Sequence, residues 1–245
     1  MYVYDCGTFR TACCELGDSF DPGTAEQYDY VMLRINVREP EKTRNLIHHG
    51  FSFHDRYLKM EINIEKTSEV RDSLAKKTPP FFLSASHDFE PVMLDMACQA
   101  YAFDRRYHLG AGYDNDMARE MIRAHLSRYK EEGCLIVKIY NNQKNELLGY
   151  TVLKKKSDFV VENVMGLTLP GIKGKVSAFG LYNGMLNTIA EMVGKKGIYM
   201  GYVSSENITS INLHNGLGAR VSGIEDEYIY RRNEMIPAAQ GREKV

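Results

Sequence analysis

A short basic turn around Gly174 is the stretch of this chain whose residue types and spacing most clearly suggest chemistry. The apolar run at 160–169 predicts a strand, and Lys173, Gly174 and Lys175 follow it. From residue 176 the apolar side chains recur at helical spacing, so a helix is expected directly after the turn. The first N–H groups of a helix have no partner within it, and two lysines add positive charge. The turn is therefore a candidate anion site for a phosphorylated ligand.

Known phosphate-binding patterns do not match this turn. A Walker-type loop needs glycine where Leu169 stands and a hydroxyl residue where Val176 stands. The three-glycine spacing of a dinucleotide fingerprint is also missing. An ordinary strand-to-helix turn with solvated lysines remains the alternative interpretation.

The continuation of the chain adds a second motif. A buried-type strand is expected at 198–203, followed by a short helix at 208–215 and an alternating strand near 228–231. Asn207 precedes the short helix, and Gly218 follows it.

These two motifs, in this order, resemble the Gcn5-related N-acetyltransferase (GNAT) superfamily. The family pattern is roughly VxPxxRGKG, a helix, a strand, and then NxxAxxLYxxLGF. Here the corresponding segments read TLPGIKGKV at 168–176 and NITSINLHNGLGA at 207–219. Two predicted helices and a three-strand meander precede them in the family's order. The resemblance implies an α/β fold with a mixed sheet, namely the GNAT acyl-CoA acyltransferase fold.

The first part of the chain resembles a reduced version of the same layout. Strands are expected at 28–37 and 51–64, with a helix at 41–49 that ends at Gly50. The pair Gly50-Phe51 falls where Gly218-Ala219 falls in the second part, but no glycine turn precedes a long helix. A smaller, truncated GNAT-like α/β domain is therefore expected before the GNAT domain.

The domain boundary is placed in the polar segment 65–80. Its end, Thr78-Pro79-Pro80, disfavours helix before each proline. The expected domains are 1–78, 79–235 for the acetyltransferase domain, and a tail at 236–245.

The resemblance implies a donor site for acetyl-CoA, held without a metal. Backbone groups of Met165, Gly166 and Leu167 would pair with the pantetheine arm as an added strand does. The pyrophosphate would lie on the helix start. The residues expected there are Lys173, Gly174, Lys175, Val176, Ser177 and Ala178, with Asn207 from the second motif.

The same resemblance suggests catalytic and acceptor residues. His214 stands where the family often has a tyrosine that protonates the leaving thiolate, and Glu162 is a candidate base acting through water. Arg105, Arg106 and His108 could bind a phosphate or carboxylate of the acceptor. The alternatives are a packing histidine, a solvent-facing carboxylate and solvated loop charges.

The implied activity is direct transfer of an acetyl group from acetyl-CoA to the amine of a small polar acceptor. The loop at 103–108 resembles the dTDP-fucosamine-type acetyltransferases, which suggests an amino sugar nucleotide. The chain differs from the family pattern at Gly171, Val176 and Ala219. This keeps two alternatives open, a catalytically inactive GNAT-like module that binds a ligand or partner, and an acyltransferase with another acyl donor.

Composition excludes several classes of protein. The chain has 31 basic and 32 acidic residues among 245, so no net field favours nucleic acid. No apolar run is long enough to span a bilayer. Five cysteines without metal-ligand spacing indicate a reducing, cytoplasmic setting. The pairs Cys13-Cys14 and His48-His49 are interpreted as packing residues and helix-end charge rather than metal ligands. A homodimer is left open.

Overall fold

The protein is described by a computed structural model that covers residues 1–6, 9–14, 19–77, 81–100, 115–141, 143, 146–169 and 172–232. The chain forms two compact units. The first comprises Met1–Tyr57, Ala102–Met121 and Ile224–Val245, and the second comprises Leu58–Tyr101 and Ile122–Gly223. The domain limits expected from sequence stay a prediction. The two units divide the chain differently, because the first unit draws on three separate segments.

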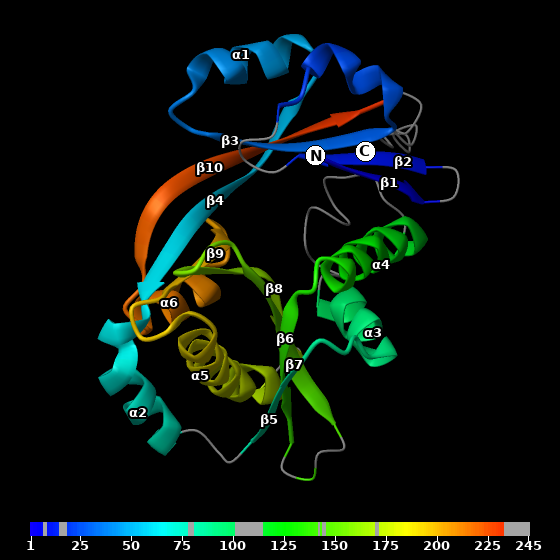
Figure 1. The fold of residues 1–245 in the computed structure, drawn as a ribbon. Coiled ribbons are helices and arrows are strands. Elements are labelled where there is room, and N and C mark those ends of the chain that lie inside the picture. The colour runs from blue at the N-terminus through cyan, green and yellow to red at the C-terminus, as the bar shows by residue number, and fades with distance from the viewer. Residues whose placement is uncertain are drawn as a thin grey trace, which may run out of the picture. The chain divides into compact units, whose positions relative to one another are not determined.

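The first unit is built on one sheet with the strand order β1-β2-β3-β10-β4 (Figure 1). These strands are β1 (Tyr2–Cys6), β2 (Phe9–Cys14), β3 (Tyr30–Asn36), β4 (Ser52–Asn63) and β10 (Arg220–Arg231), of which β4 and β10 continue into the second unit. β1 and β2 are antiparallel, β2 and β3 are parallel, and β3 and β10 are antiparallel. The 3-10 helix η1 (Pro22–Gln27) and helix α1 (Pro40–His48) complete the unit.

The alternation expected at 28–37 is confirmed by β3. Val31, Leu33 and Ile35 are buried in a core with Leu46 from α1. α1 and η1 pack against this face of the sheet and contribute Leu46 and Ala25 to the core. α1 begins at Pro40, where proline suits the first turn of a helix, and it ends at His48. The chain leaves the helix through Gly50, whose φ of 83° favours glycine.

The second unit contains another section of the ten-stranded sheet, with the order β4-β9-β8-β7-β6-β5. Its remaining strands are β5 (Phe82–Ser86), β6 (Leu135–Tyr140), β7 (Leu147–Lys155), β8 (Val160–Thr168) and β9 (Ile198–Ser204). Its helices are α2 (Ser68–Lys77), α3 (Pro91–Ala100), α4 (Asn115–Glu131, in this unit from Ile122), α5 (Ile172–Val193) and α6 (Ile208–Gly216). The meander and helices expected after residue 81 are present, and β5 is an additional strand.

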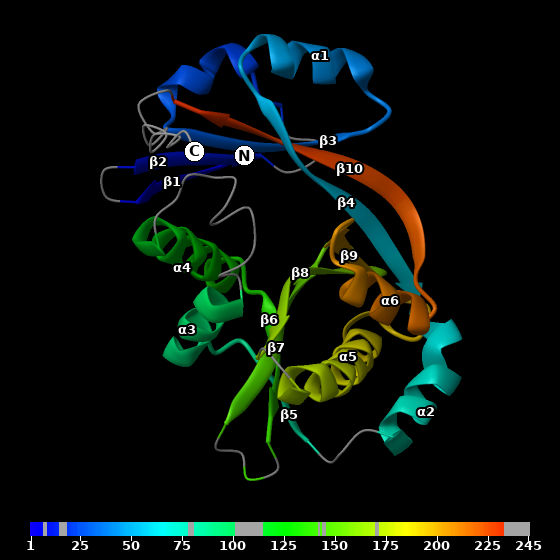
Figure 2. The ribbon, with the colours of Figure 1, turned by 180° about the vertical axis from the view of Figure 1, so that it is seen from behind.

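The two faces of this section of the sheet carry different helices (Figures 1 and 2). α5 and α6 pack on one face, where Leu186 and Leu217 share a core with Ile62 and Val161. α3 and the described part of α4 lie on the other face. Tyr150 marks that side, because its hydroxyl donates to the carbonyl of Met93 in α3 at 3.0 Å.

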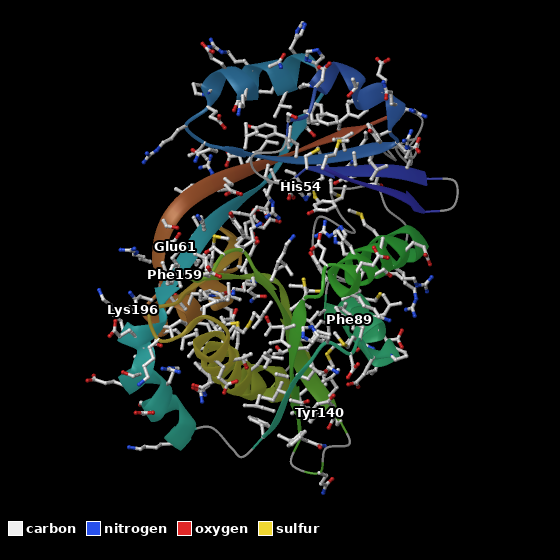
Figure 3. All side chains as sticks on the ribbon, in the orientation of Figure 1. His54, Glu61, Phe89, Tyr140, Phe159 and Lys196 are labelled. Carbon is white, nitrogen blue, oxygen red and sulfur yellow. The ribbon has the colours of Figure 1, made fainter. Side chains whose placement is uncertain are left out.

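A buried charge fixes the start of α3 to the sheet. Lys138 of β6 is 3% exposed, and its ammonium donates to Glu90 at 2.6 Å. Tyr140, labelled in Figure 3, ends β6 and donates its hydroxyl to the same carboxylate at 2.7 Å. The hydrogen bond from Lys138 lowers the pKa of Glu90, while burial raises the pKa of Tyr140 to about 12. The Glu90 carboxylate therefore stays ionised near neutral pH and keeps this connection.

The segment 65–80, in which the domain boundary is expected, contains helical structure. Residues Ile64–Thr67 form the 3-10 helix η2, and Ser68–Lys77 form α2. Asn63 caps η2 by accepting from the Glu65 N–H at 3.1 Å, and Val70 packs against the core. α2 ends at Lys77.

No helix in the described part of the chain is long and apolar enough to cross a membrane.

The contact between β7 and β8 gives a test of this fold. A Cβ on Gly149 would lie 2.7 Å from the Leu167 carbonyl oxygen, so Gly149→Ala forces backbone apart. We expect this variant to lose about 1–3 kcal/mol of unfolding free energy. Urea unfolding measures the loss.

Gly216→Ala is the matched control, because a Cβ at this position meets nothing within 4 Å. It is expected to be neutral or slightly stabilising, since alanine is the better helix former. Equal stability of the two variants would contradict the pairing of β7 with β8 described here.

Candidate functional site

Helix α6 carries His214 into the interior of the second unit. The helix begins at its cap Asn207, whose side chain accepts from the Ser210 N–H at 3.0 Å. His214 lies in the last turn and is 1% exposed. The φ of 81° at Gly218 then ends the helix. Helix α6 thus places a histidine in a buried position.

Two tyrosines from neighbouring elements meet His214. The hydroxyl of Tyr199, on β9, lies 2.8 Å from His214 Nε2. The hydroxyl of Tyr182, on α5, lies 3.5 Å from the same nitrogen. On the other side of the ring, His214 Nδ1 lies 2.8 Å from the Ser210 carbonyl oxygen. Both ring nitrogens are therefore engaged by protein groups.

The hydrogen bonds continue from Tyr199 into β8 and β7. The Asn163 amide nitrogen donates to the Tyr199 hydroxyl at 3.4 Å. The Thr151 hydroxyl donates to the Asn163 amide oxygen at 2.8 Å and also lies 3.2 Å from the Met165 carbonyl oxygen. We call this set the polar chain: Thr151, Asn163, Tyr199, Tyr182 and His214. It links five elements, namely β7, β8, β9, α5 and α6.

Burial sets the protonation of the polar chain. Loss of solvation lowers the pKa of His214 and raises the pKa of Tyr182 to about 12. It also raises the pKa of Tyr199 well above its usual value. A neutral imidazole and two protonated phenols are the stable forms near neutral pH.

A bulge in β8 decides which side chains join the polar chain. Leu153 pairs with Asn163 and Val152 pairs with Met165, so Val164 is an extra residue in β8. The bulge shifts the alternation of the strand by one residue. Asn163 therefore contacts Tyr199, while the sulfur of Met165 lies 3.7 Å from the Tyr150 hydroxyl, on the α3 side.

β8 and β9 separate beyond the pair formed by Asn163 and Gly201. Their parallel ladder runs from Val160↔Ile198 to Asn163↔Gly201, and both strands extend further, to Thr168 and Ser204. Beyond Asn163 the described residues of β8 pair with β7. Met165, Gly166 and Leu167 therefore lie on the strand end that has left β9. The predicted donor segment lies in the part of β8 that has separated from its neighbour.

Two glycines adjoin the polar chain at this level. A Cβ on Gly201 would lie 2.4 Å from the Tyr199 hydroxyl oxygen. A Cβ on Gly166 would lie 3.0 Å from the Asn163 amide nitrogen. The absence of side chains at these positions leaves room for the two polar groups.

The predicted anion turn belongs to α5 itself. The helix was expected from Val176 but begins at Ile172, so Gly174 lies in its first turn. Glycine is tolerated there because the first N–H groups make no intrahelical bonds. Lys173, Lys175, Val176, Ser177 and Ala178 follow within the first two turns. The free N–H groups therefore belong to earlier residues than expected.

The other predicted residues do not join the polar chain. Glu162 lies between Val161 and Asn163 on β8, and its carboxylate pairs with Lys156 at 3.3 Å. Successive strand residues point to opposite faces, so Glu162 points away from Tyr199. Arg105, Arg106 and His108 lie outside the described residues. Among the described residues no group of three His, Cys, Asp or Glu side chains could hold a metal ion.

Sequence reasoning missed Thr151, Asn163, Tyr182 and Tyr199. Thr151 and Asn163 are polar residues inside apolar strands, which is a signal of a satisfied buried group. Tyr182 and Tyr199 were counted among apolar positions. Only the fold reveals that their hydroxyls point to one histidine.

Comparison with known proteins rests on structure. No family model and no curated protein matches the sequence. A tandem GNAT protein from the clavulanic acid biosynthesis pathway is similar, with a TM-score of 0.58 at 11% identity over 86% of this chain and 67% of that chain. A functionally unknown protein from Staphylococcus epidermidis has a TM-score of 0.57 at 11% identity, over 84% and 74% of the two chains.

A third solved structure, from Enterococcus faecalis, is of unknown function and is termed a probable N-acyltransferase. It has a TM-score of 0.53 at 12% identity, and the match covers 85% of this chain but 46% of that one. At such low sequence identities, these similarities support a shared fold and nothing more specific. The resemblance to dTDP-fucosamine-type enzymes stays a prediction. The expected fold class is confirmed: the chain has the mixed α/β GNAT fold, and its likeness extends to a protein with two GNAT units.

Proposed function

We propose that the protein is an acyl-CoA-dependent N-acetyltransferase that acetylates the amine of a small polar acceptor. One observation carries the proposal: β8 and β9 part beside the Tyr199–His214 pair. An acyl carbonyl bound at the parting would lie near hydroxyl groups that can move a proton. The GNAT fold of the neighbours supports the same assignment.

The residues present fit acetyl-CoA. The separated end of β8 at Met165, Gly166 and Leu167 offers backbone groups to an extended pantetheine arm. Gly166 is exposed and has no side chain to obstruct it. The start of α5, with Lys173 and Lys175, offers N–H groups and positive charge for a diphosphate. When bound, the cofactor supplies the thioester that the amine attacks.

The polar chain indicates the direction of proton transfer. A carbonyl oxygen only accepts, so His214 Nδ1 carries the proton in its bond to Ser210. Because burial keeps the ring neutral, Nε2 is an acceptor and Tyr199 donates to it. His214 thus orients the Tyr199 hydroxyl. The departing thiolate would take the Tyr199 proton when that hydroxyl turns from Nε2 to the sulfur, and the proton released by the attacking amine would restore the hydroxyl.

The acceptor side rests on the sequence predictions. Glu162 is proposed as the base that acts through water, and Arg105, Arg106 and His108 as groups that bind the acceptor. An amino sugar nucleotide remains the first candidate acceptor. A cytoplasmic location and a homodimer are likewise expectations.

Binding of acetyl-CoA is the first test. Isothermal titration is expected to show saturable binding, and Lys175→Glu is expected to weaken it about tenfold or more by repelling the diphosphate. Lys195→Glu makes the same charge change beyond the other end of α5, where the lysine is exposed, and should bind like the unmodified protein. Absence of binding at millimolar acetyl-CoA would refute the enzyme proposal. Binding without turnover of any amine would favour the inactive module instead.

The proton-transfer role of Tyr199 is tested by kcat. Tyr199→Phe removes the hydroxyl and is expected to lower kcat about hundredfold. His214→Phe should also lower kcat, whereas His214→Gln keeps an acceptor for Tyr199 and should lose less. Steady-state kinetics with saturating acetyl-CoA measures the effect.

Tyr150→Phe is the matched control, because it removes another buried tyrosine hydroxyl, one that points to α3. It should lose a little stability and keep its kcat. An equal kcat loss in both tyrosine variants would mean that packing, and not proton transfer, explains the effect.

The buried histidine also predicts how stability depends on pH. Burial lowers the pKa of His214 from the ordinary 6.5, so the unfolded chain binds the extra proton first. The stabilising effect of the neutral ring is complete above about pH 6.5 and is lost as pH falls through the folded pKa. Urea midpoints between pH 7.5 and pH 5 should therefore fall more steeply for the unmodified chain than for His214→Gln. Parallel curves would contradict a neutral buried His214.

A further inference from the structure

Asn163 lies where β8 leaves its neighbour β9. It forms the last pair of their parallel ladder, with Gly201. Val164, the extra residue of the bulge, follows it, and Met165 then pairs with β7. The Asn163 side chain therefore lies at the point where the two strands separate. It is half-buried, whereas Gly166, on the separated part of β8, is exposed.

Hydrogen bonding fixes which way the Asn163 amide points. Tyr199 has one hydroxyl proton, and it donates this proton to His214 Nε2. The phenol oxygen can then only accept, so the amide atom that lies 3.4 Å from it is the Nδ2 donor. The amide oxygen faces the other way, where the Thr151 hydroxyl donates to it at 2.8 Å. The direction of each donor along the polar chain therefore places the Asn163 N–H groups on the side of Tyr199.

The N–H groups of this amide have weak acceptors in the described structure. The contact of Asn163 Nδ2 with the Tyr199 hydroxyl is 3.4 Å long, and its contact with the Met185 sulfur is 3.8 Å long. An ordinary N–H···O hydrogen bond is about 2.7–3.2 Å long, and a thioether sulfur is a weak acceptor. The amide therefore retains the capacity to donate to a stronger acceptor. An oxygen that carries negative charge is the strongest kind.

Side chains at two neighbouring positions would obstruct the donors, and both positions are glycine. A Cβ on Gly166 would lie 3.0 Å from Asn163 Nδ2. A Cβ on Gly201 would lie 2.4 Å from the Tyr199 hydroxyl oxygen. Because Gly166 is exposed, a ligand group that lies along the separated strand comes next to the amide nitrogen without meeting a side chain at this position.

We infer that the Asn163 amide donates a hydrogen bond to the acyl carbonyl oxygen of the bound thioester. This inference rests on the proposed function. As the amine nitrogen bonds to the carbonyl carbon, the π electron pair moves onto the oxygen, and the Asn163 N–H stabilises the charge. The pair then returns, the carbon–sulfur bond breaks with its electrons going to sulfur, and Tyr199 gives its proton to the sulfur. The proton lost by the amine restores the Tyr199 hydroxyl.

Asn163 supplies a function that Tyr199 does not have available. The single Tyr199 proton is required by the departing sulfur, so this hydroxyl does not serve the carbonyl oxygen at the same time. A side-chain amide donates hydrogen bonds without giving up its protons. The polar chain therefore offers one group that transfers a proton and one group that only stabilises charge.

Asn163→Leu tests the inference, because leucine has a similar size and no hydrogen-bond donor. kcat is expected to fall about hundredfold to thousandfold, the effect of removing one donor to a developing negative oxygen. The affinity for acetyl-CoA, measured by isothermal titration, should change much less, since the charge arises only during the attack. Asn187→Leu makes the same change at an exposed position of α5, where the side chain accepts from Arg71, and should keep its kcat.

Infrared difference spectra give a readout besides turnover. Acetyl-CoA labelled with a heavy carbon isotope at the thioester carbonyl is expected to show a lower carbonyl stretching frequency when bound than when free, because a hydrogen bond weakens the C=O bond. The downshift should be smaller in Asn163→Leu than in the unmodified protein and in Asn187→Leu. A purely structural role of Asn163 would change stability and leave the downshift as it is.

Thr151→Val keeps the test decisive if Asn163→Leu fails to fold. It preserves the shape of the side chain and removes the donor that orients the amide, so a kcat loss of about tenfold and a reduced downshift are expected. An unchanged downshift in the folded variants, with or without a loss of kcat, would overturn the inference while the proposed function stands. Absence of acetyl-CoA binding to the unmodified protein would overturn both, so the two failures are distinguishable.

Discussion

The hydrogen bond between Tyr199 and His214 is the constraint on which the candidate site depends. It joins β9 to α6 at 2.8 Å in a region without solvent, where an unpaired phenol or imidazole is costly. Asn163 and Thr151 extend the bond across β8 and β7. The position of each strand in the middle of this sheet is therefore tied to one buried polar chain.

The bulge at Val164 and the glycine at position 201 make that hydrogen bond possible. Without the extra residue, Asn163 and Met165 would point to the same face of β8. Without glycine at 201, the Tyr199 hydroxyl would have no space. The same level of the sheet is where β8 and β9 separate, so the polar chain and the predicted donor segment lie next to each other.

Sequence patterns predicted the regular elements better than the site. The strand expected at 28–37 corresponds to β3, and the helix expected at 41–49 corresponds to α1, because alternation and turn residues are local signals. The polar composition of 65–80 hid α2, since only Val70 of that helix anchors it to the apolar core in the described structure. The face of β8 on which Asn163 lies is set by the bulge in its pairing with β7. A local sequence pattern does not indicate such a bulge. The sequence pattern did not identify Tyr199, because its ring is apolar and its hydrogen-bond partner, His214, lies fifteen residues further along the chain.

The first unit is assembled from segments far apart in the chain. This determines how late during synthesis its sheet can be completed. β3 lies between β2 and β10, and the residues of β10 that pair with it are 225–231. During synthesis the ribosome must complete nearly the whole polypeptide before that edge of β3 is covered. Until then the nascent sheet exposes an open strand, a state that invites pairing with other chains. A cut anywhere in the middle of the chain would leave the same edge uncovered, so neither fragment is expected to behave as an independent protein.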